Sequence, residues 1–393
     1  MQEPVGKRSF QYLVLGLGGI GSAAAYWLAR QAGADVLGLE QFPLGHVRGG
    51  SQDHSRIIRL SYHNTTYVKL AQAAYRAWTA VEADANEQLV YKTGGLDLSP
   101  AGSRLPLTDY TNSLTALNIP YEQLDAAEMM VRWPQWQLPD HVTGLYQSES
   151  GLVAAAKSNA AHQRLARAYG ATLRDNAPVT AIYPAGNEIT VVAGGETYTC
   201  EKLVIASGAW TNQLLAHFGH QINLTVTQEQ VTYYASPHPA DFAPERFPIW
   251  IWLDEPCFYG FPAFGEAGPK IAQDVGGRET TAESRTFEID PAAFQRTDTF
   301  LRQHLPTAHG PIITAKTCLY TMPPDRDFVL DTLPGQPNVA VAVGAGHAFK
   351  FASLLGTILS QLAITGQSEH DLSLFQFSRP ILFAENPVKE FMV

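Results

Sequence analysis

The sequence predicts an α/β protein in which a discontinuous Rossmann-like dinucleotide-binding domain carries an inserted antiparallel β-sheet substrate domain. Three observations predict this fold class. Residues 10–40 hold an apolar run, a glycine-rich turn, a small-residue helix and a second apolar run, which is the order of a βαβ unit. Residues 221–275 are rich in β-branched residues, aromatic residues and proline, a composition typical of an antiparallel sheet. Residues 338–365 return to an apolar strand followed by a helix.

The individual elements follow from local patterns. A helix over 64–86 is predicted because apolar side chains recur there at spacings of three and four. The other elements are strands over 10–16, 34–40, 89–98 and 338–344, short strands near 178–183, 188–193, 196–199 and 203–206, and helices over 19–32, 153–169 and 349–365. This order assigns residues 1–85, 145–220 and 318–393 to the dinucleotide-binding domain and residues 86–144 and 221–317 to the substrate domain.

The charge balance excludes several classes of protein. The 393 residues include 27 Lys and Arg against 37 Asp and Glu, a net charge of −10, and 16% of the residues are charged. A share of about 25% is usual, so little of the chain can be a solvated tail, and a disordered protein is excluded. Neither nucleic acid nor a membrane is expected as a partner of an acidic chain.

Two further features concern the compartment. The apolar stretch over 12–29 is interrupted by four glycines, so we do not expect a signal peptide or a membrane span there. Three scattered cysteines, Cys200, Cys257 and Cys318, are too few for a disulfide framework or a zinc site. We therefore expect a reducing, cytoplasmic location and no metal.

The strongest local motif is Gly16-x-Gly18-x-x-Gly21, which stands between a predicted strand and a predicted helix. Glycines at these positions permit a tight turn and a close approach of a pyrophosphate to the helix N-terminus, where Gly19 and Ile20 lie. Glu40 ends the next strand, the position at which dinucleotide-binding folds carry the acidic residue that binds the two ribose hydroxyls. A glycine-rich turn without a ligand is the alternative, and the motif alone does not separate FAD from NAD.

Two arginines follow the second strand. Arg56 and Arg59 stand three residues apart between apolar side chains, in a chain that is poor in charge. A guanidinium in such surroundings pairs well with a carboxylate or a flavin carbonyl. Two surface arginines on a turn are the alternative interpretation.

The segment GSQDHSRIIR, which contains both arginines, resembles the family of monomeric sarcosine oxidase and N-methyltryptophan oxidase, FAD-dependent amine oxidases with a D-amino-acid-oxidase-type fold. The resemblance continues along the whole chain, in TGGLDLSP (93–100), RWP (132–134), SESGLV (148–153), APVTAI (177–182), LVIASGAW (203–210), FYGFP (258–262), KTCLYTMPPDRDFVLDTLP (316–334) and HAFKFASLLG (347–356).

The resemblance implies bound FAD, attached covalently to Cys318 through a thioether. Such a bond needs a thiolate, and the nearby Lys316 could assist by lowering the thiol pKa. Without the resemblance, Cys318 would be read as an inert core cysteine. The cofactor site implied by the family, besides the glycine motif, Glu40 and Cys318, comprises Gln41, Gly50, Ser51, Ser55, Arg56, Val179, Ser207, Gly208, Trp210, Gly344, Gly346, His347, Phe349 and Lys350.

The resemblance also implies catalytic roles. Arg59 and Lys350 match the residues that hold the substrate carboxylate, Tyr259 matches a tyrosine of the substrate pocket, and Arg56 matches an arginine against the flavin ring. Lys270 matches a lysine beside the flavin, where a fixed positive charge favours reduction of O2. Taken alone, Lys350 would be read as a helix lysine reaching for solvent and Tyr259 as a sheet aromatic.

The chain also departs from the family pattern. Asp274 stands where the family has a histidine, and Ser51 and Gln52 replace two histidines. Asp274 would either accept the proton of the substrate ammonium or pair with Lys270. Trp250 and Trp252 are expected to add bulk near the pocket.

The implied reaction is oxidation of a secondary amine, an N-methyl amino acid, to an imine that hydrolyses to aldehyde and amine, while O2 is reduced to hydrogen peroxide. The expected partners are therefore a small amine or amino acid and O2, and a monomer is expected. The alternatives are a flavin dehydrogenase, an oxidase of a primary or cyclic amino acid, or a non-catalytic dinucleotide-binding protein.

Overall fold

The structure, a computed structural model, describes residues 7–390, and one sheet in it carries the predicted βαβ unit. Its strands run in the order β10 (Val179–Ala185), β11 (Glu188–Ala193), β12 (Glu196–Ile205), β1 (Ser9–Leu15), β2 (Val36–Leu39) and β9 (Thr172–Arg174), with β20 (Gln336–Val343) beside β12 and β19 (Val329–Leu333) beside β20. The pairs β9–β2, β2–β1, β1–β12 and β12–β20 are parallel. This is the α/β arrangement that the sequence predicts.

The helices of this half pack on the sheet and on one another. They are α1 (Gly19–Ala32), α2 (Thr65–Ala85), α5 (Ala155–Ala168), α6 (Thr211–Leu215) and α8 (Ala352–Thr365). The segment Ala348–Thr365 is apolar and long enough to cross a membrane, but 67% of it is buried inside the protein, where α8 packs on α1 and α2. Close packing of α1 and α8 depends on Gly356, because a Cβ there would lie 2.6 Å from the Cβ of Ala23.

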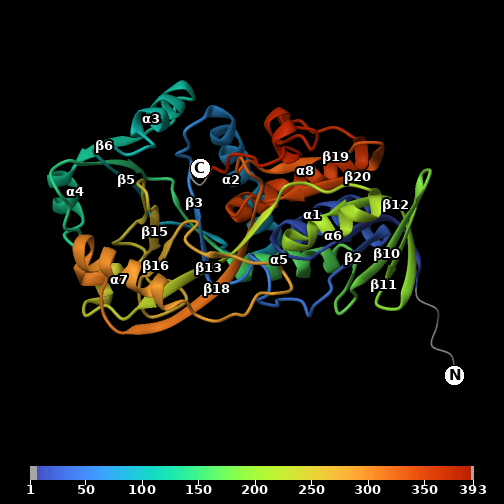
Figure 1. The fold of residues 1–393 in the computed structure, drawn as a ribbon, viewed down its shortest axis with the longest axis horizontal. Helices are drawn as coiled ribbons and strands as arrows, with labels where there is room; N and C mark the ends of the chain where they lie inside the picture. Colours follow the sequence, from blue (N-terminus) through green and yellow to red (C-terminus); the bar gives the residue numbers. More distant parts are fainter. Residues whose placement is uncertain (1–6, 391–393) are drawn as a thin grey trace.

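The second sheet forms the other half of the molecule (Figure 1). Its strands run in the order β17 (Arg278–Glu279), β13 (Thr225–Tyr234), β16 (Lys270–Gln273), β15 (Phe258–Phe261), β14 (Ile249–Trp252), β5 (Gly95–Pro100), β7 (Val142–Gln147) and β6 (Glu122–Asp125), with β18 (Ile312–Met322) beside β13. The prediction of an antiparallel sheet is confirmed for all but one of its strand pairs. One pair, β14–β5, is parallel.

The helices α3 (Leu107–Ala116), α4 (Ala126–Arg132) and α7 (Pro291–His304) accompany the second sheet. The long strands β13 and β18 run from this half toward the first sheet (Figure 1). A third, three-stranded sheet of β3 (Ser55–Ile58), β8 (Gly151–Ala154) and β4 (Val90–Lys92) carries the arginine segment.

The predicted strand over 89–98 is wrong as a single element. Gly94 adopts φ +73°, a conformation that glycine tolerates, and the chain breaks there into β4 and β5, which enter different sheets. Conversely, the short strands near 196–199 and 203–206 form one strand, β12. The predicted domain boundaries remain a prediction, and those at 144/145 and 317/318 fall inside β7 and β18.

Candidate active site

One large cavity lies where the parallel strands of the first sheet end and the second sheet begins. Its wall includes the ends of β1, β2 and β12 together with residues of β14, β15 and β18. The carboxyl ends of parallel strands are the usual ligand site of such sheets. The predicted site residues on its wall are Gly16, Gly18, Gly19, Ile20, Glu40, Gln41, Gly50, Ser51, Arg56, Arg59, Val179, Ser207, Gly208, Trp210, Tyr259, Asp274, Gly344, Gly346, His347, Phe349 and Lys350.

The glycine-rich turn has the geometry that a dinucleotide needs. Gly16 adopts φ +87°, and a Cβ on it would lie 2.7 Å from the carbonyl oxygen of Ala206. The Gly19 amide begins α1 and donates to the hydroxyl of Ser51 at 2.8 Å. The turn therefore exposes backbone rather than side chains to the cavity at a helix N-terminus, where phosphate groups bind. These residues fit the pyrophosphate of FAD.

Glu40 lies at the end of β2, where a ribose would bind. Its carboxylate accepts hydrogen bonds from the amides of Leu17 at 2.8 Å and Phe42 at 3.2 Å. Burial alone would raise the pKa of Glu40, but His46 and these two amides lower it, so the side chain is ionised. An ionised carboxylate at this position accepts hydrogen bonds from a ribose diol and repels a 2′-phosphate.

Gly21 does not line the cavity, but it is expected to be indispensable. A Cβ at Gly21 would lie 1.8 Å from the carbonyl oxygen of Gly16, which is backbone and cannot move aside. We expect Gly21→Ala to yield protein that is unfolded or lacks flavin, measured as the ratio of flavin absorbance to protein absorbance. In the control Gly219→Asn, nothing lies within 4 Å of the new Cβ and φ is +73°, which asparagine tolerates. Full flavin content in Gly21→Ala would contradict the steric argument.

Cationic groups gather at the other part of the cavity. Arg59 directly follows β3, and its buried guanidinium pairs with Asp97 at 2.7 Å. The Asp97 carboxylate also accepts a hydrogen bond from the hydroxyl of Ser61. The Arg59 guanidinium and the Lys350 ammonium lie over the same Tyr62 ring, at 4.9 and 5.7 Å from its centroid. Burial, and after it the charge of Arg59, lower the pKa of Lys350 to about 7. An anion here would meet two cations, one of which is compensated by Asp97.

Asp274, which the sequence placed either with the substrate ammonium or with Lys270, pairs instead with Arg326 at 2.9 Å. Arg326 is buried and lies on the cavity wall, and the backbone carbonyl of Arg326 is 3.0 Å from Nε2 of His347. The interpretation that Asp274 pairs with Lys270 is therefore wrong. Asp274 still lines the cavity, as does Tyr259, whose hydroxyl is 3.5 Å from that of Tyr320.

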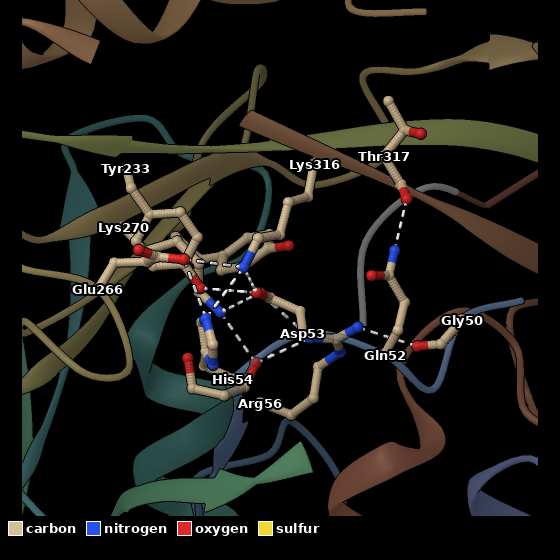
Figure 2. Close-up of polar contacts among 12 residues, drawn as sticks. Gly50, Gln52, Asp53, His54, Arg56, Tyr233, Glu266, Lys270, Lys316 and Thr317 are labelled. Atoms are coloured by element: carbon tan, nitrogen blue, oxygen red, sulfur yellow. Dashed lines mark hydrogen bonds and ion pairs between the residues drawn. The ribbon is translucent and has the colours of Figure 1, made fainter. Parts of the chain in front are cut away.

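Lys270 lies behind the cavity wall rather than on it. Its ammonium is buried and donates to the Asp53 carboxylate at 3.0 Å and to the carbonyl oxygen of Ser55 at 2.9 Å (Figure 2). Ser55 likewise does not line the cavity. Two neighbours of this cluster do line the cavity: Arg56, whose guanidinium is 3.7 Å from Asp53, and Phe261, whose ring centroid is 4.0 Å from the Lys270 ammonium.

Cys318 is buried in β18 and does not line the cavity, although Leu319 and Tyr320 do. Burial raises the pKa of the Cys318 thiol to about 11, and the charge of Arg56 opposes this rise. The suggestion that Lys316 lowers this pKa is not supported, since the Lys316 ammonium is turned to Asp53 at 3.1 Å and Glu266 at 3.1 Å. A second thiol, Cys257, lines the cavity.

The two tryptophans predicted near the pocket lie elsewhere. Trp250 and Trp252 point from β14 into the core and pack on Phe300 of α7, whereas Ile251 between them lines the cavity. This alternation follows from the two-residue period of a strand. The prediction that they add bulk to the pocket is wrong.

Sequence reasoning missed Asp53, Asp97 and Arg326. Asp97 stands between two leucines, which is the kind of signal that singled out Arg56 and Arg59. Asp53 has polar neighbours and Arg326 stands between two aspartates, so no such signal marks them. Among the described residues 7–390, no group of three or more His, Cys, Asp or Glu is arranged to hold a metal ion.

The fold and the cavity define a dinucleotide-binding protein. The family model described as FAD dependent oxidoreductase (DAO) matches residues 11–362. The chain belongs to this family, and it is therefore an FAD-dependent enzyme.

Similar proteins cover nearly the whole chain. Monomeric sarcosine oxidase of Streptomyces avermitilis is 35% identical over 93% of this chain and 97% of its own length. N-methyl-L-tryptophan oxidase of Salmonella arizonae is 30% identical over 94% of this chain and 99% of its own. Among solved structures, the open form of NikD, an unusual amino acid oxidase essential for nikkomycin biosynthesis, superposes with a TM-score of 0.83 at 27% identity and covers 94% of this chain and 98% of its own.

Proposed function

We propose that this enzyme oxidises a secondary amine, an N-methyl amino acid, to an imine that water hydrolyses to an aldehyde and an amine, with O2 as the electron acceptor. The observation that carries the proposal is the pair of cations, Arg59 and Lys350, over one aromatic ring on the wall of the FAD cavity. The names of the similar enzymes, which act on sarcosine and N-methyl-L-tryptophan, agree with it.

When bound, FAD would supply the redox chemistry, taking two electrons from the amine and passing them to O2. The protein's own groups bind and orient the substrate. Lys350 and Arg59 hold the substrate carboxylate, Tyr259 and Tyr320 bound the space beside it, and the Asp274–Arg326 pair presents a carboxylate toward the amine. The Lys270 ammonium supplies positive charge near the position where O2 is reduced.

A screen of amino acids with peroxide detection tests the proposed function. N-methyl amino acids should show the highest kcat/KM, with one hydrogen peroxide per turnover. Flavin reduction without peroxide would instead identify a dehydrogenase, and a preference for primary or cyclic amino acids would identify the alternative substrate class. Purified protein without flavin would contradict the enzyme assignment altogether.

We further propose that FAD is covalently attached to Cys318. Its support is the family resemblance of the KTCLYT segment and the positive charge of Arg56, which opposes the rise in the pKa of the thiol. We expect flavin fluorescence to stay with the protein band on a denaturing gel, to be lost in Cys318→Ala, and to persist in Cys257→Ala. Because Cys257 lines the cavity and Cys318 does not, loss of the signal in Cys257→Ala alone would reassign the bond.

We propose a monomeric enzyme in the cytoplasm. The monomer is supported by the names of the similar sarcosine oxidases. The compartment is supported by the three free thiols, Cys200, Cys257 and Cys318.

A further inference from the structure

The Asp53 carboxylate is the centre of a cluster of charged side chains (Figure 2). Asp53 itself does not line the cavity. Its side chain is 3% exposed, and it accepts from the Lys270 ammonium at 3.0 Å, the Lys316 ammonium at 3.1 Å and the Tyr233 hydroxyl at 2.8 and 2.9 Å. The guanidinium of Arg56, which lines the cavity, is 3.7 Å away. One carboxylate is thus shared by three cations.

The backbone at this position is also unusual. Asp53 adopts φ +81°, outside the range that side chains other than glycine normally take. Such a conformation costs about 1–3 kcal/mol and persists only where the surroundings impose it. In this conformation the Asp53 carboxylate contacts Lys270 of β16 and Lys316 of β18.

The cluster has an inner and an outer part. Lys270 is 1% exposed, and Asp53 is its one carboxylate partner among the ion pairs of the described residues. Lys316 is 27% exposed and has a second carboxylate, Glu266, at 3.1 Å, with Nε2 of His54 at 3.0 Å. Loss of Asp53 would therefore leave Lys316 with one carboxylate partner, Glu266, and Lys270 with no carboxylate partner among the described residues.

The charge state of Lys270 depends on that one partner. Around its ammonium lie Asp53, Arg56, the thiol of Cys318, the rings of Tyr233 and Phe261, and the carbonyl oxygen of Ser55. The Lys316 ammonium binds the other oxygen of Asp53. Burial, together with the charge of Arg56, lowers the pKa of Lys270 to about 8, although Asp53 opposes both effects. A buried ammonium without a counterion loses its proton rather than bear the desolvation cost.

We propose that Asp53 is the positioning residue of Lys270, which it holds in the charged form, with its ammonium fixed beside Arg56 at the cofactor cavity. This inference rests on the proposed function, in which the positive charge of Lys270 favours the reduction of O2. Asp53 itself touches neither substrate nor cofactor. It acts through the lysine, and its removal should change when the lysine is charged.

The test uses the holoenzyme, reduced by light without any amine and then mixed with O2 at pH values from about 6 to 10. In the unchanged protein the reoxidation rate should fall as pH rises through about 8, because Lys270 is charged only below its pKa. In Asp53→Asn the fall should occur at least one pH unit lower, so that the rate near pH 7.5 drops by about threefold or more. In Lys270→Met reoxidation should be slow at every pH, and it should be no slower in the double variant that combines Asp53→Asn with Lys270→Met.

Matched variants separate a charge effect from a structural one. Glu266→Gln removes a carboxylate from the outer part of the same cluster and should leave the pH midpoint of reoxidation nearly unchanged. Lys316→Met frees Asp53 for Lys270 and should move the midpoint upward, which also keeps the proposal testable if Asp53→Asn does not fold. Equal midpoints in Asp53→Asn and Glu266→Gln, an unmoved midpoint in Lys316→Met, or additive losses in the double variant would overturn the proposal.

A second measurement distinguishes this inference from the proposed function. The midpoint potential of the bound flavin is measured as a function of pH. When Lys270 loses its proton, a positive charge near the flavin disappears and the potential should become more negative. In Asp53→Asn this drop should occur at a lower pH than in the unchanged protein. If O2 does not reoxidise the unchanged enzyme, the oxidase proposal fails while the potential still tests Asp53. If O2 does so and the potentials coincide at every pH, the role of Asp53 is wrong.

Discussion

Replacement of Lys350 by methionine is expected to lower kcat/KM for the amine by about 100-fold. Truncating one partner of a partly buried, charge-assisted contact costs about 3 kcal/mol, and about 1.4 kcal/mol corresponds to a factor of ten. The loss should be found mainly in KM, because the carboxylate is bound equally in the ground state and the transition state. Steady-state kinetics at saturating O2 measure it. Lys69→Met, at an exposed position of α2, is the control and should stay within about twofold.

The pH dependence of kcat/KM gives this prediction a second, independent signature. Lys350 has a pKa of about 7, so it is charged below pH 7 and loses its charge as pH rises through that value. We therefore expect kcat/KM to carry a limb that descends above about pH 7, and this limb should be absent in Lys350→Met. A limb that survives the substitution would assign it to another group and would contradict the carboxylate-binding role.

Replacement of Asp97 by asparagine is expected to destabilise the enzyme by about 3 kcal/mol. The Arg59–Asp97 pair is almost fully buried, at 5% and 4% side-chain exposure, and Asp97 keeps the pKa of Arg59 raised even though burial opposes this. Arg59 thus stays charged when the carboxylate is removed, and breaking a buried pair from one side leaves a charge that burial penalises. Thermal unfolding followed by circular dichroism should show a melting temperature lower by several degrees.

The matched control for this prediction is an exposed ion pair. Arg104 and Glu255 lie 3.1 Å apart at 71% and 66% exposure. Such a pair contributes little, so Arg104→Gln should change the free energy of unfolding by less than about 1 kcal/mol. A similar loss in Asp97→Asn and Arg104→Gln would mean that burial does not govern the strength of these pairs.

Most of the fold could be predicted from local patterns. The helix expected over 19–32 has those bounds as α1, and the helix over 64–86 is α2 with Asn64 and Asn86 as its caps. These elements have long, regular apolar spacing and clear end signals, so their sequences specify them with little help from the rest of the chain. The segment 89–98 shows the limit of such reasoning, because its division at Gly94 depends on which sheet each half joins.

The candidate site divides in the same way. The glycine motif and Glu40 belong to one βαβ unit, so their spacing alone predicts a cavity for a dinucleotide, and the structure places most of them on one wall. The pairings of the charged residues could not be predicted. Asp53 meets Lys270 across 217 positions and Arg326 meets Asp274 across 52.

The sequence by itself determined the class of this protein: an α/β flavoenzyme of the FAD-dependent oxidoreductase family, with a few basic residues standing out in an acidic chain. Only the tertiary structure decided how those charges are used. It pairs Arg59 with Asp97, turns Asp274 to Arg326, and sets Lys270 behind the cavity wall on Asp53. The physical reason is that a motif is read along the chain, whereas a buried charge is stabilised by whatever partner folding brings within about 3 Å.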